Sequence, residues 1–150
     1  MKVTDSFIID ASRKNVWDVF MDVEKLASCL PGCKDLIAKS ETEYEANMEV
    51  KTAFMKVNFK ANGFLKEAIE EEELNVEMVG KPMKLAGQFK TTMKVKLEEL
   101  EPNQTKINYD MNLQMTGRLA SLGDVLMRGT VKKSAGEFAD NVQSLFTPVE

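Results

Sequence analysis

The stretch that decides the fold is Met55-Lys56-Val57-Asn58-Phe59-Lys60-Ala61-Asn62-Gly63-Phe64-Leu65-Lys66. Apolar or small residues occupy its odd positions, and most of its even positions hold lysine or asparagine. Side chains two residues apart lie on the same face of a strand. The stretch is therefore predicted to be a strand of an antiparallel sheet, with one apolar and one solvated face. Its length requires curvature, for which Gly63 is expected to form a kink.

The same alternation continues on both sides of this strand. It predicts further strands over Tyr44–Lys51, Leu74–Met78, Leu85–Leu100 and Ile107–Met115. Glu70–Glu73, Gly80–Pro82 and Pro102–Gln104 are predicted to be turns between them, with the four glutamates on a solvated hairpin. Tight turns join neighbouring antiparallel strands. We therefore expect a six-strand meander.

The segment before the meander predicts a strand followed by two short helices. Val3–Ile9 is short and apolar, which is typical of a strand. Asp10 or Ser12 is expected to cap a helix that carries Val16, Trp17 and Phe20 on one face. A second helix is predicted over Val23–Cys29, and Pro31 ends it because proline cannot continue a helix.

After Thr116-Gly117 the pattern predicts one long helix of about 28 residues, or about 40 Å at 1.5 Å per residue, closed by Pro148. Its apolar stripe is expected to contain Leu119, Leu122, Leu126, Ala135, Phe138, Val142 and Leu145. The glycines at 123, 129 and 136 inside it predict a close approach to the sheet or a local bend.

These elements predict an α+β helix-grip arrangement in one domain over residues 1–150. A seven-stranded curved antiparallel sheet is expected to wrap around the long C-terminal helix, with two short helices between strands 1 and 2. That long helix is taken as the only cover for the concave face of the sheet. A helix is about 10 Å wide, too narrow to cover such a face, so a hollow is expected between them.

The composition excludes several classes of protein. Twenty basic against 24 acidic residues give a net charge of −4, so no basic excess exists to bind nucleic acid. The chain has no histidine, which excludes Ser-His-Asp chemistry and histidine metal sites. We expect no metal and no cofactor. No stretch approaches the roughly 20 apolar residues of a membrane span. Two cysteines, Cys29 and Cys33, are too few for a disulfide scaffold, so a cytoplasmic protein with reduced thiols is expected.

Methionine is unusually frequent on the predicted concave face, at positions 48, 55, 78, 93, 111 and 115. Its flexible side chain suits a surface that repacks around hydrophobic ligands, although it also fills ordinary cores. A hydrophobic small molecule is the expected ligand. The predicted ligand-binding residues are Met48, Val57, Phe59, Met78, Phe89, Thr91, Met93, Tyr109, Met111, Leu122 and Leu126.

Catalytic groups are scarce. Tyr44, Tyr109 and Thr91 offer hydroxyl groups, and Cys33 lacks a histidine to activate it, so we assign no catalytic residue. An enzyme acting on an apolar substrate, such as a cyclase or hydratase, needs an inward carboxylate whose pKa burial raises. The alternation places nearly every glutamate outward. An inward Asp or Glu opposite Tyr109 would favour the enzyme.

Leu30-Pro31-Gly32-Cys33, Trp17, and the run from Leu119-Ala120-Ser121-Leu122-Gly123 through Gly129, Lys132-Lys133 and Phe138 resemble the CoxG family of carbon monoxide dehydrogenase subunits. This family belongs to the START and Bet v 1-like (SRPBCC) superfamily of helix-grip proteins. The resemblance implies a hydrophobic cavity. It also implies a role beside a molybdenum-containing oxidoreductase, in enzyme assembly, membrane recruitment or quinone handling.

The sequence therefore leaves three functions open. The first is a non-enzymatic carrier or sensor of a lipid-like or quinone-like molecule, and the second is the enzyme described above. The third is an assembly factor that acts through its protein surface, for which apolar residues exposed around Leu30-Pro31-Gly32 would be the sign. Arg128, Lys132 and Lys133 on the last helix would allow peripheral contact with acidic lipid.

Overall fold

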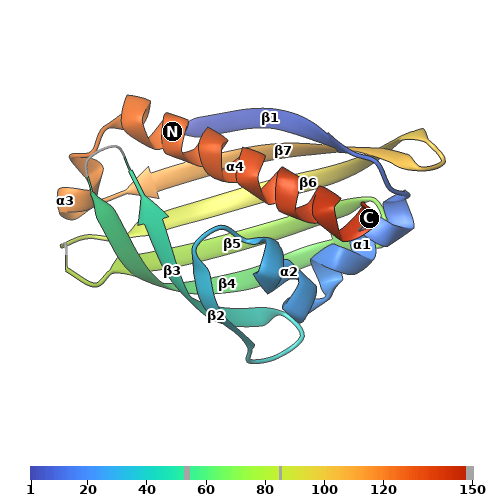
Figure 1. Cartoon of the computed structure of the whole chain (residues 1–150). Helices are drawn as coiled ribbons and strands as arrows, with labels where there is room; N and C mark the ends of the chain where they lie inside the picture. The colour runs from blue at the N-terminus through green and yellow to red at the C-terminus, as the bar shows by residue number, and fades with distance from the viewer. Residues whose placement is uncertain (53–54, 85, 148–150) are drawn as a thin grey trace.

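The computed structural model describes residues 1–52, 55–84 and 86–147, so Leu85 and Pro148 of the predicted elements lie outside the described residues. The chain is α+β, with one curved sheet and helices on its concave side (Figure 1). The elements, in chain order, are β1 (Lys2–Ile9), α1 (Arg13–Met21), α2 (Val23–Cys29), β2 (Cys33–Ala38), β3 (Glu43–Lys51), β4 (Lys56–Ile69), β5 (Glu73–Pro82), β6 (Phe89–Glu101), β7 (Gln104–Met115), α3 (Gly117–Ala120) and α4 (Asp124–Phe146).

The strands of the described ranges form one seven-stranded antiparallel sheet in the order β1-β7-β6-β5-β4-β3-β2. The predicted α+β fold and strand count are confirmed. Successive partners run across the sheet in rows that share one face. One row is Gly63–Met78–Thr91–Leu113, and the next is Leu65–Val76–Met93–Met111–Val3. These are the positions that the alternation assigns to the concave face, so the predicted register is confirmed.

Three details of the sheet differ from the sequence prediction. The sequence pattern predicts six meander strands but gives no range for the one that forms β2, Cys33–Ala38. β2 is an edge strand, and none of its side chains is fully buried, so its alternation is weak. β5 does not end at Gly80 but continues to Pro82, since Gly80 and Pro82 pair with Ala61 and Phe59 of β4. The irregularity in β4 lies between Leu65 and Glu67 rather than at Gly63.

The two short helices follow the predicted signals. Ser12 caps α1, and its hydroxyl oxygen accepts the backbone N–H of Asn15 at 3.2 Å. Asp22 caps α2 by accepting the N–H groups of Glu24 and Lys25. An N-cap of this kind satisfies backbone donors that have no partner inside the helix.

The predicted long C-terminal helix is confirmed, but it starts later than predicted and is shorter than 28 residues. α3 ends at Ala120, and Gly123, with φ of 83°, caps a separate α4 of 23 residues, about 34 Å long. On α4, Met127 and Val142 are buried, whereas Leu145 of the predicted stripe is 45% exposed. A Cβ atom at Gly129 or Gly136 would meet no atom within 4 Å, so these glycines do not mark a close approach to the sheet.

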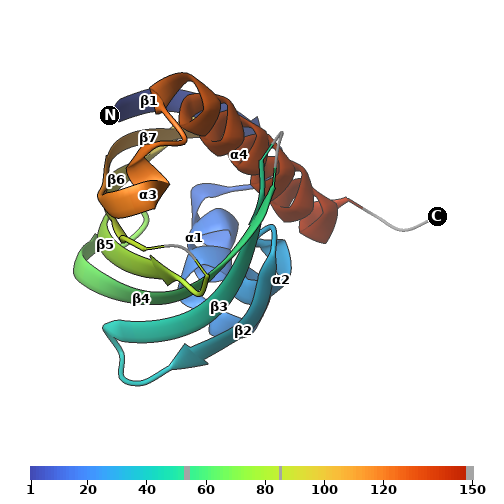
Figure 2. The ribbon, with the colours of Figure 1, turned by 90° about the vertical axis from the view of Figure 1, so that its left-hand side faces the viewer.

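The concave face carries two core clusters in the described residues, one at each end. At one end Trp17, Val16 and Val19 of α1 pack with Leu97 and Ile107 of the sheet and Val142 of α4. At the other end Leu119 of α3 packs with Val57 and Phe59. The prediction that the long helix is the only cover is therefore wrong, because α1 and α3 also cover the concave face. Figure 2 shows α4 along the open side of the curled sheet, and Figure 1 shows α3 and α1 at opposite ends of it.

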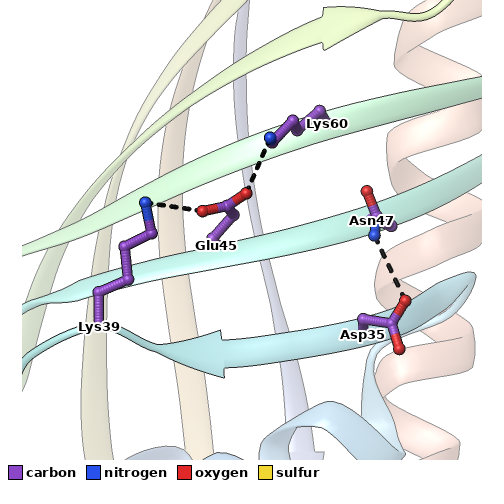
Figure 3. A network of polar contacts seen from close by, with 5 residues as sticks. All are labelled: Asp35, Lys39, Glu45, Asn47 and Lys60. Carbon is purple, nitrogen blue, oxygen red and sulfur yellow. Dashed lines mark hydrogen bonds and ion pairs between the residues drawn. The ribbon is translucent and has the colours of Figure 1, made fainter.

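The outer face of the sheet is polar. The Glu45 carboxylate forms ion pairs with Lys39 at 2.7 Å and Lys60 at 3.0 Å (Figure 3). The Asn47 side chain donates a hydrogen bond to the Asp35 carboxylate at 3.3 Å. Hydrogen bonds from Lys39 and Lys60 lower the pKa of Glu45 below its ordinary value. This face is solvated, as the alternation predicts. No helix in the described ranges is long and apolar enough to cross a membrane.

Candidate functional site

The candidate site is the middle of the concave face, between the two core clusters. Nine of the predicted ligand-binding residues lie on strands, and the strand register places them on this face. Val57 and Phe59 belong to the cluster around Leu119, and Met48 and Phe89 pack against it. The others occupy the centre of the sheet: Met78, Thr91, Met93, Tyr109 and Met111.

The central methionines are less buried than their position suggests. Met78, Met93 and Met111 lie on β5, β6 and β7, each with a strand on either side, and face the helices. They are nevertheless only half-buried, whereas Ile107 and Leu119 in the two clusters are 1% exposed. The described side chains therefore do not close over the centre of this face as tightly as over its ends. Met55, predicted to face inward, precedes β4 and is 38% exposed.

Two hydroxyl groups on this face have no partner among the described residues. Thr91 is 5% exposed and Tyr109 7% exposed, yet neither side-chain oxygen takes part in a hydrogen bond. In the described part of the chain, Arg13 Nε is the one fully buried side-chain nitrogen or oxygen without a hydrogen-bond partner. The hydroxyl oxygens of Thr91 and Tyr109 also lack a partner, so they are not fully buried and reach accessible space. By contrast, the Thr105 hydroxyl donates to the Ala11 carbonyl at 2.8 Å, and that of Tyr44 donates to Glu41 at 3.1 Å.

Sequence reasoning missed Asp5. Register pairs Asp5 of β1 with Tyr109 of β7, so an acidic side chain shares the concave face with Tyr109. The apolar run Phe7-Ile8-Ile9 predicts the strand but not its faces, which follow from the alternation Val3, Asp5, Phe7, Ile9. Asp5 is exposed, and its Oδ1 accepts the Ser6 N–H at 2.8 Å.

Burial and the nearby Asp5 carboxylate both raise the pKa of Tyr109 above its ordinary value. Its hydroxyl therefore stays protonated at neutral pH and is available as a donor. The ring lies 6.3 Å from the ring of Phe7, which in turn meets Phe138 of α4 edge-on at 6.2 Å. Such ring contacts fix the orientation of the phenol.

The two predicted residues outside the strands have different positions. Leu122 lies in the connection between α3 and α4 and packs against the Leu119 cluster. Leu126 is half-buried on α4, and its neighbour Met127, which was not predicted, is 9% exposed. At 3.6 residues per turn, Met127 lies about 60° from the buried Val142 around α4, whereas Leu126 lies about 160° from it.

No nucleophile or metal site emerges within the described ranges. Cys29 and Cys33 are free thiols, and burial raises the pKa of each above its ordinary value. A raised pKa keeps a thiol protonated and weakly nucleophilic. No cluster of three or more Cys, Asp or Glu residues placed to hold a metal ion occurs there.

Two depressions on the surface of the described residues lie away from the middle of the concave face, one of them over the outer side of β5, β6 and β7 and the other beside α1 and the ends of β5 and β6. Each has a volume of about 540 Å³. One is lined by Thr4, Lys94, Asp110 and other polar residues together with Val76, Met93 and Met111, and the other by Arg13, Ile69, Leu97 and several glutamates. Most of these wall residues are charged or polar, which does not suit an apolar ligand.

The chain is similar to solved structures over nearly its whole length. A conserved protein from Geobacillus kaustophilus has a TM-score of 0.89 at 20% identity, covering 97% of this chain and 94% of that one. A START superfamily protein from Mycobacterium smegmatis has a TM-score of 0.75 at 11% identity, with coverage of 96% and 95%. The Zhui aromatase/cyclase from Streptomyces sp. R1128 has a TM-score of 0.68 at 12% identity, with coverage of 97% and 92%. These likenesses establish a shared START and Bet v 1-like fold.

A comparison with curated protein sequences finds no match. The sequence model of one family does match, over residues 6–146, which covers every strand and helix except the first residues of β1. The chain therefore belongs to the CoxG family of carbon monoxide dehydrogenase subunits.

Proposed function

We propose that this protein binds a hydrophobic small molecule, lipid-like or quinone-like, between the concave face of the sheet and α4. The observation that carries this proposal is the half-buried state of Met78, Met93 and Met111 at the centre of the sheet. Unfilled space beside apolar side chains forfeits dispersion contacts that a ligand would restore. The START and Bet v 1-like fold and the family membership support the same function.

The role of such binding in the cell is proposed from the family alone. The ligand would serve the assembly or the quinone handling of a carbon monoxide dehydrogenase-type, molybdenum-containing oxidoreductase in the cytoplasm. An assembly surface at Leu30-Pro31-Gly32 has less support, because Leu30 and Pro31 are half-buried. Apolar side chains with a larger exposed fraction lie elsewhere, at Ile37, Met83 and Val125.

Acid-base catalysis is the second candidate, because Asp5 lies opposite Tyr109 as the enzyme hypothesis requires. That chemistry also needs a carboxylate buried enough to hold its proton near neutral pH. Asp5 is exposed, which leaves its charge hydrated. The arrangement therefore favours binding over proton transfer.

The proposal is tested by extracting the purified protein with organic solvent and identifying the extract by mass spectrometry. A co-purified apolar molecule, or saturable binding of the neutral dye N-phenyl-1-naphthylamine, is the expected result. Protein that is consistently empty and ignores the dye would contradict the proposal.

Replacing Met93 with alanine is expected to weaken dye binding about tenfold, because one buried apolar side chain contributes about 1.5 kcal/mol of contact. Lys94 provides the control, since it is the next residue of β6 and faces the opposite side of the sheet. Lys94→Ala is expected to leave the affinity unchanged. Fluorescence titration of both variants checks this, and equal effects would show that the dye does not bind on the concave face.

A further inference from the structure

Asp5 and Tyr109 form a polar pair at the edge of the concave face. Asp5 lies on the edge strand β1, directly opposite Tyr109 of β7. Side chains opposed in this way have Cβ atoms about 4.5–5.5 Å apart. Apart from Glu99 near the end of β6, Asp5 is the one charged residue whose register places it on this face in the described strands.

Both side chains keep unused hydrogen-bonding capacity. Asp5 accepts one backbone N–H, from Ser6, and forms no ion pair with any cation of the described chain. An ionised carboxylate has about four acceptor positions, so most of them remain open. The Tyr109 hydroxyl has no partner within the described ranges and can both donate and accept.

The Tyr109 ring is oriented by its neighbours. Phe7 of β1 contacts it at a centroid distance of 6.3 Å, and Phe138 of α4 packs behind Phe7 at 6.2 Å. Groups that are already oriented lose little freedom on binding, which favours specificity.

We propose that Asp5 and Tyr109 together bind a neutral hydroxyl group at one end of the apolar ligand, an aliphatic alcohol or a phenol. This inference rests on the proposed function and specifies its ligand class. A hydroxyl group satisfies both partners, because its hydrogen is donated to Asp5 and its oxygen accepts the Tyr109 hydrogen.

Other end groups fit less well. A ketone or quinone oxygen can accept from Tyr109 but offers no hydrogen to Asp5, whose negative charge then faces a second acceptor. A carboxylate or phosphate brings like charge beside Asp5 and is repelled. The pair therefore distinguishes alcohols from fatty acids, and hydroquinones from quinones.

The apolar body of the ligand would extend from Tyr109 over Met111 and Met93 toward Thr91. These residues lie in three successive rows of the sheet, so the positions of Tyr109 and Thr91 are offset by about 13 Å along the strands. The unpaired Thr91 hydroxyl marks the far end of this path.

The test measures displacement of N-phenyl-1-naphthylamine by two matched compounds, 4-heptylphenol and its methyl ether, 4-heptylanisole. The wild-type protein is expected to prefer the phenol about tenfold or more, the factor for a hydrogen bond to a charged group. Asp5→Ala is expected to reduce that preference to about twofold or less and to leave the affinity for the anisole unchanged, because only the phenol donates to Asp5. Tyr109→Phe is expected to weaken binding of both compounds, because both oxygens can accept the Tyr109 hydrogen.

Asp110→Ala is the matched control. Asp110 carries the same charge next to Tyr109 in sequence, but it lies on the outer face, where it accepts the Thr4 hydroxyl at 2.8 Å. This variant should keep the preference for the phenol. The anion 4-heptylbenzoate should bind the wild type more weakly than the phenol and should gain affinity in Asp5→Ala.

A spectroscopic readout tests the pair without a ligand. The chain has two tyrosines, so tyrosinate absorbance in a Tyr44→Phe background reports Tyr109 alone. Asp5→Ala should lower the pKa of Tyr109, and Asp110→Ala should lower it less. Equal binding of phenol and anisole by the wild type, or equal effects of the two aspartate variants, would overturn the inference. Failure of the dye to bind at all would overturn the proposed function as well.

Discussion

Replacing Gly32 with alanine is expected to lower the free energy of unfolding by about 3 kcal/mol or more. Gly32 has φ of 74°, a conformation that alanine adopts only with strain. A Cβ atom there would also overlap the backbone carbonyl oxygen of Glu49. Because Glu49 donates its N–H to the Gly32 carbonyl at 2.8 Å, the contact that docks this turn on β3 would be lost.

Gly129→Ala is the control for this experiment. Gly129 lies inside α4, where a Cβ atom meets nothing within 4 Å, so alanine should stabilise the helix by about 0.5–1 kcal/mol. Urea unfolding of both variants measures the two changes. A Gly32→Ala protein as stable as the wild type would show that the Leu30-Pro31-Gly32-Cys33 turn does not pack as described.

The second prediction compares the two buried threonines. Thr105→Val is expected to cost about 1–3 kcal/mol, because the Ala11 carbonyl loses the hydroxyl that donates to it at 2.8 Å. Thr91→Val should cost nothing measurable, because the Thr91 hydroxyl has no partner among the described residues. Valine has nearly the shape of threonine, so packing changes little in either variant.

Thermal or urea unfolding measures this pair as well. Thr91→Val should in addition strengthen binding of the neutral dye, since a methyl group replaces a hydroxyl on the binding face. A loss of stability in Thr91→Val as large as that in Thr105→Val would mean that the centre of the concave face is closed by protein groups.

Much of the fold follows from the sequence because strand alternation is a local signal. The stretch from Met55 to Lys66 predicts which residues face inward, and the cross-strand partners Met78, Thr91 and Leu113 confirm it. The two caps, Ser12 and Asp22, are equally local. Such signals depend on neighbours within a few residues, which a sequence displays directly.

What the sequence does not reveal depends on long-range contacts. Gly123 could be read as an interior helix glycine, and only its φ of 83° shows that α4 starts anew there. On α4, Met127 is buried and Leu126 is only half-buried. Likewise, Trp17 marks an apolar helix face, but its partners Leu97 and Ile107 lie more than 70 residues away, so the cover that α1 provides was not expected.

Asp5 illustrates the same limit for the candidate site. Its face is set by pairing with β7, a strand about a hundred residues later, and not by its neighbours in the chain. The alternation of Val3, Asp5, Phe7 and Ile9 contains the signal, yet one charged residue among apolar ones normally indicates the outer face.

The measurement that tests the central claim most directly is a methyl NMR titration with methionine labelled at its terminal carbon. The neutral dye is added to wild-type protein, with resonances assigned by single substitutions. We expect the signals of Met78, Met93 and Met111 to shift with one common dissociation constant, while that of Met21, 38% exposed on α1, stays in place. Unchanged signals for the three central methionines would contradict a ligand site between the sheet and α4.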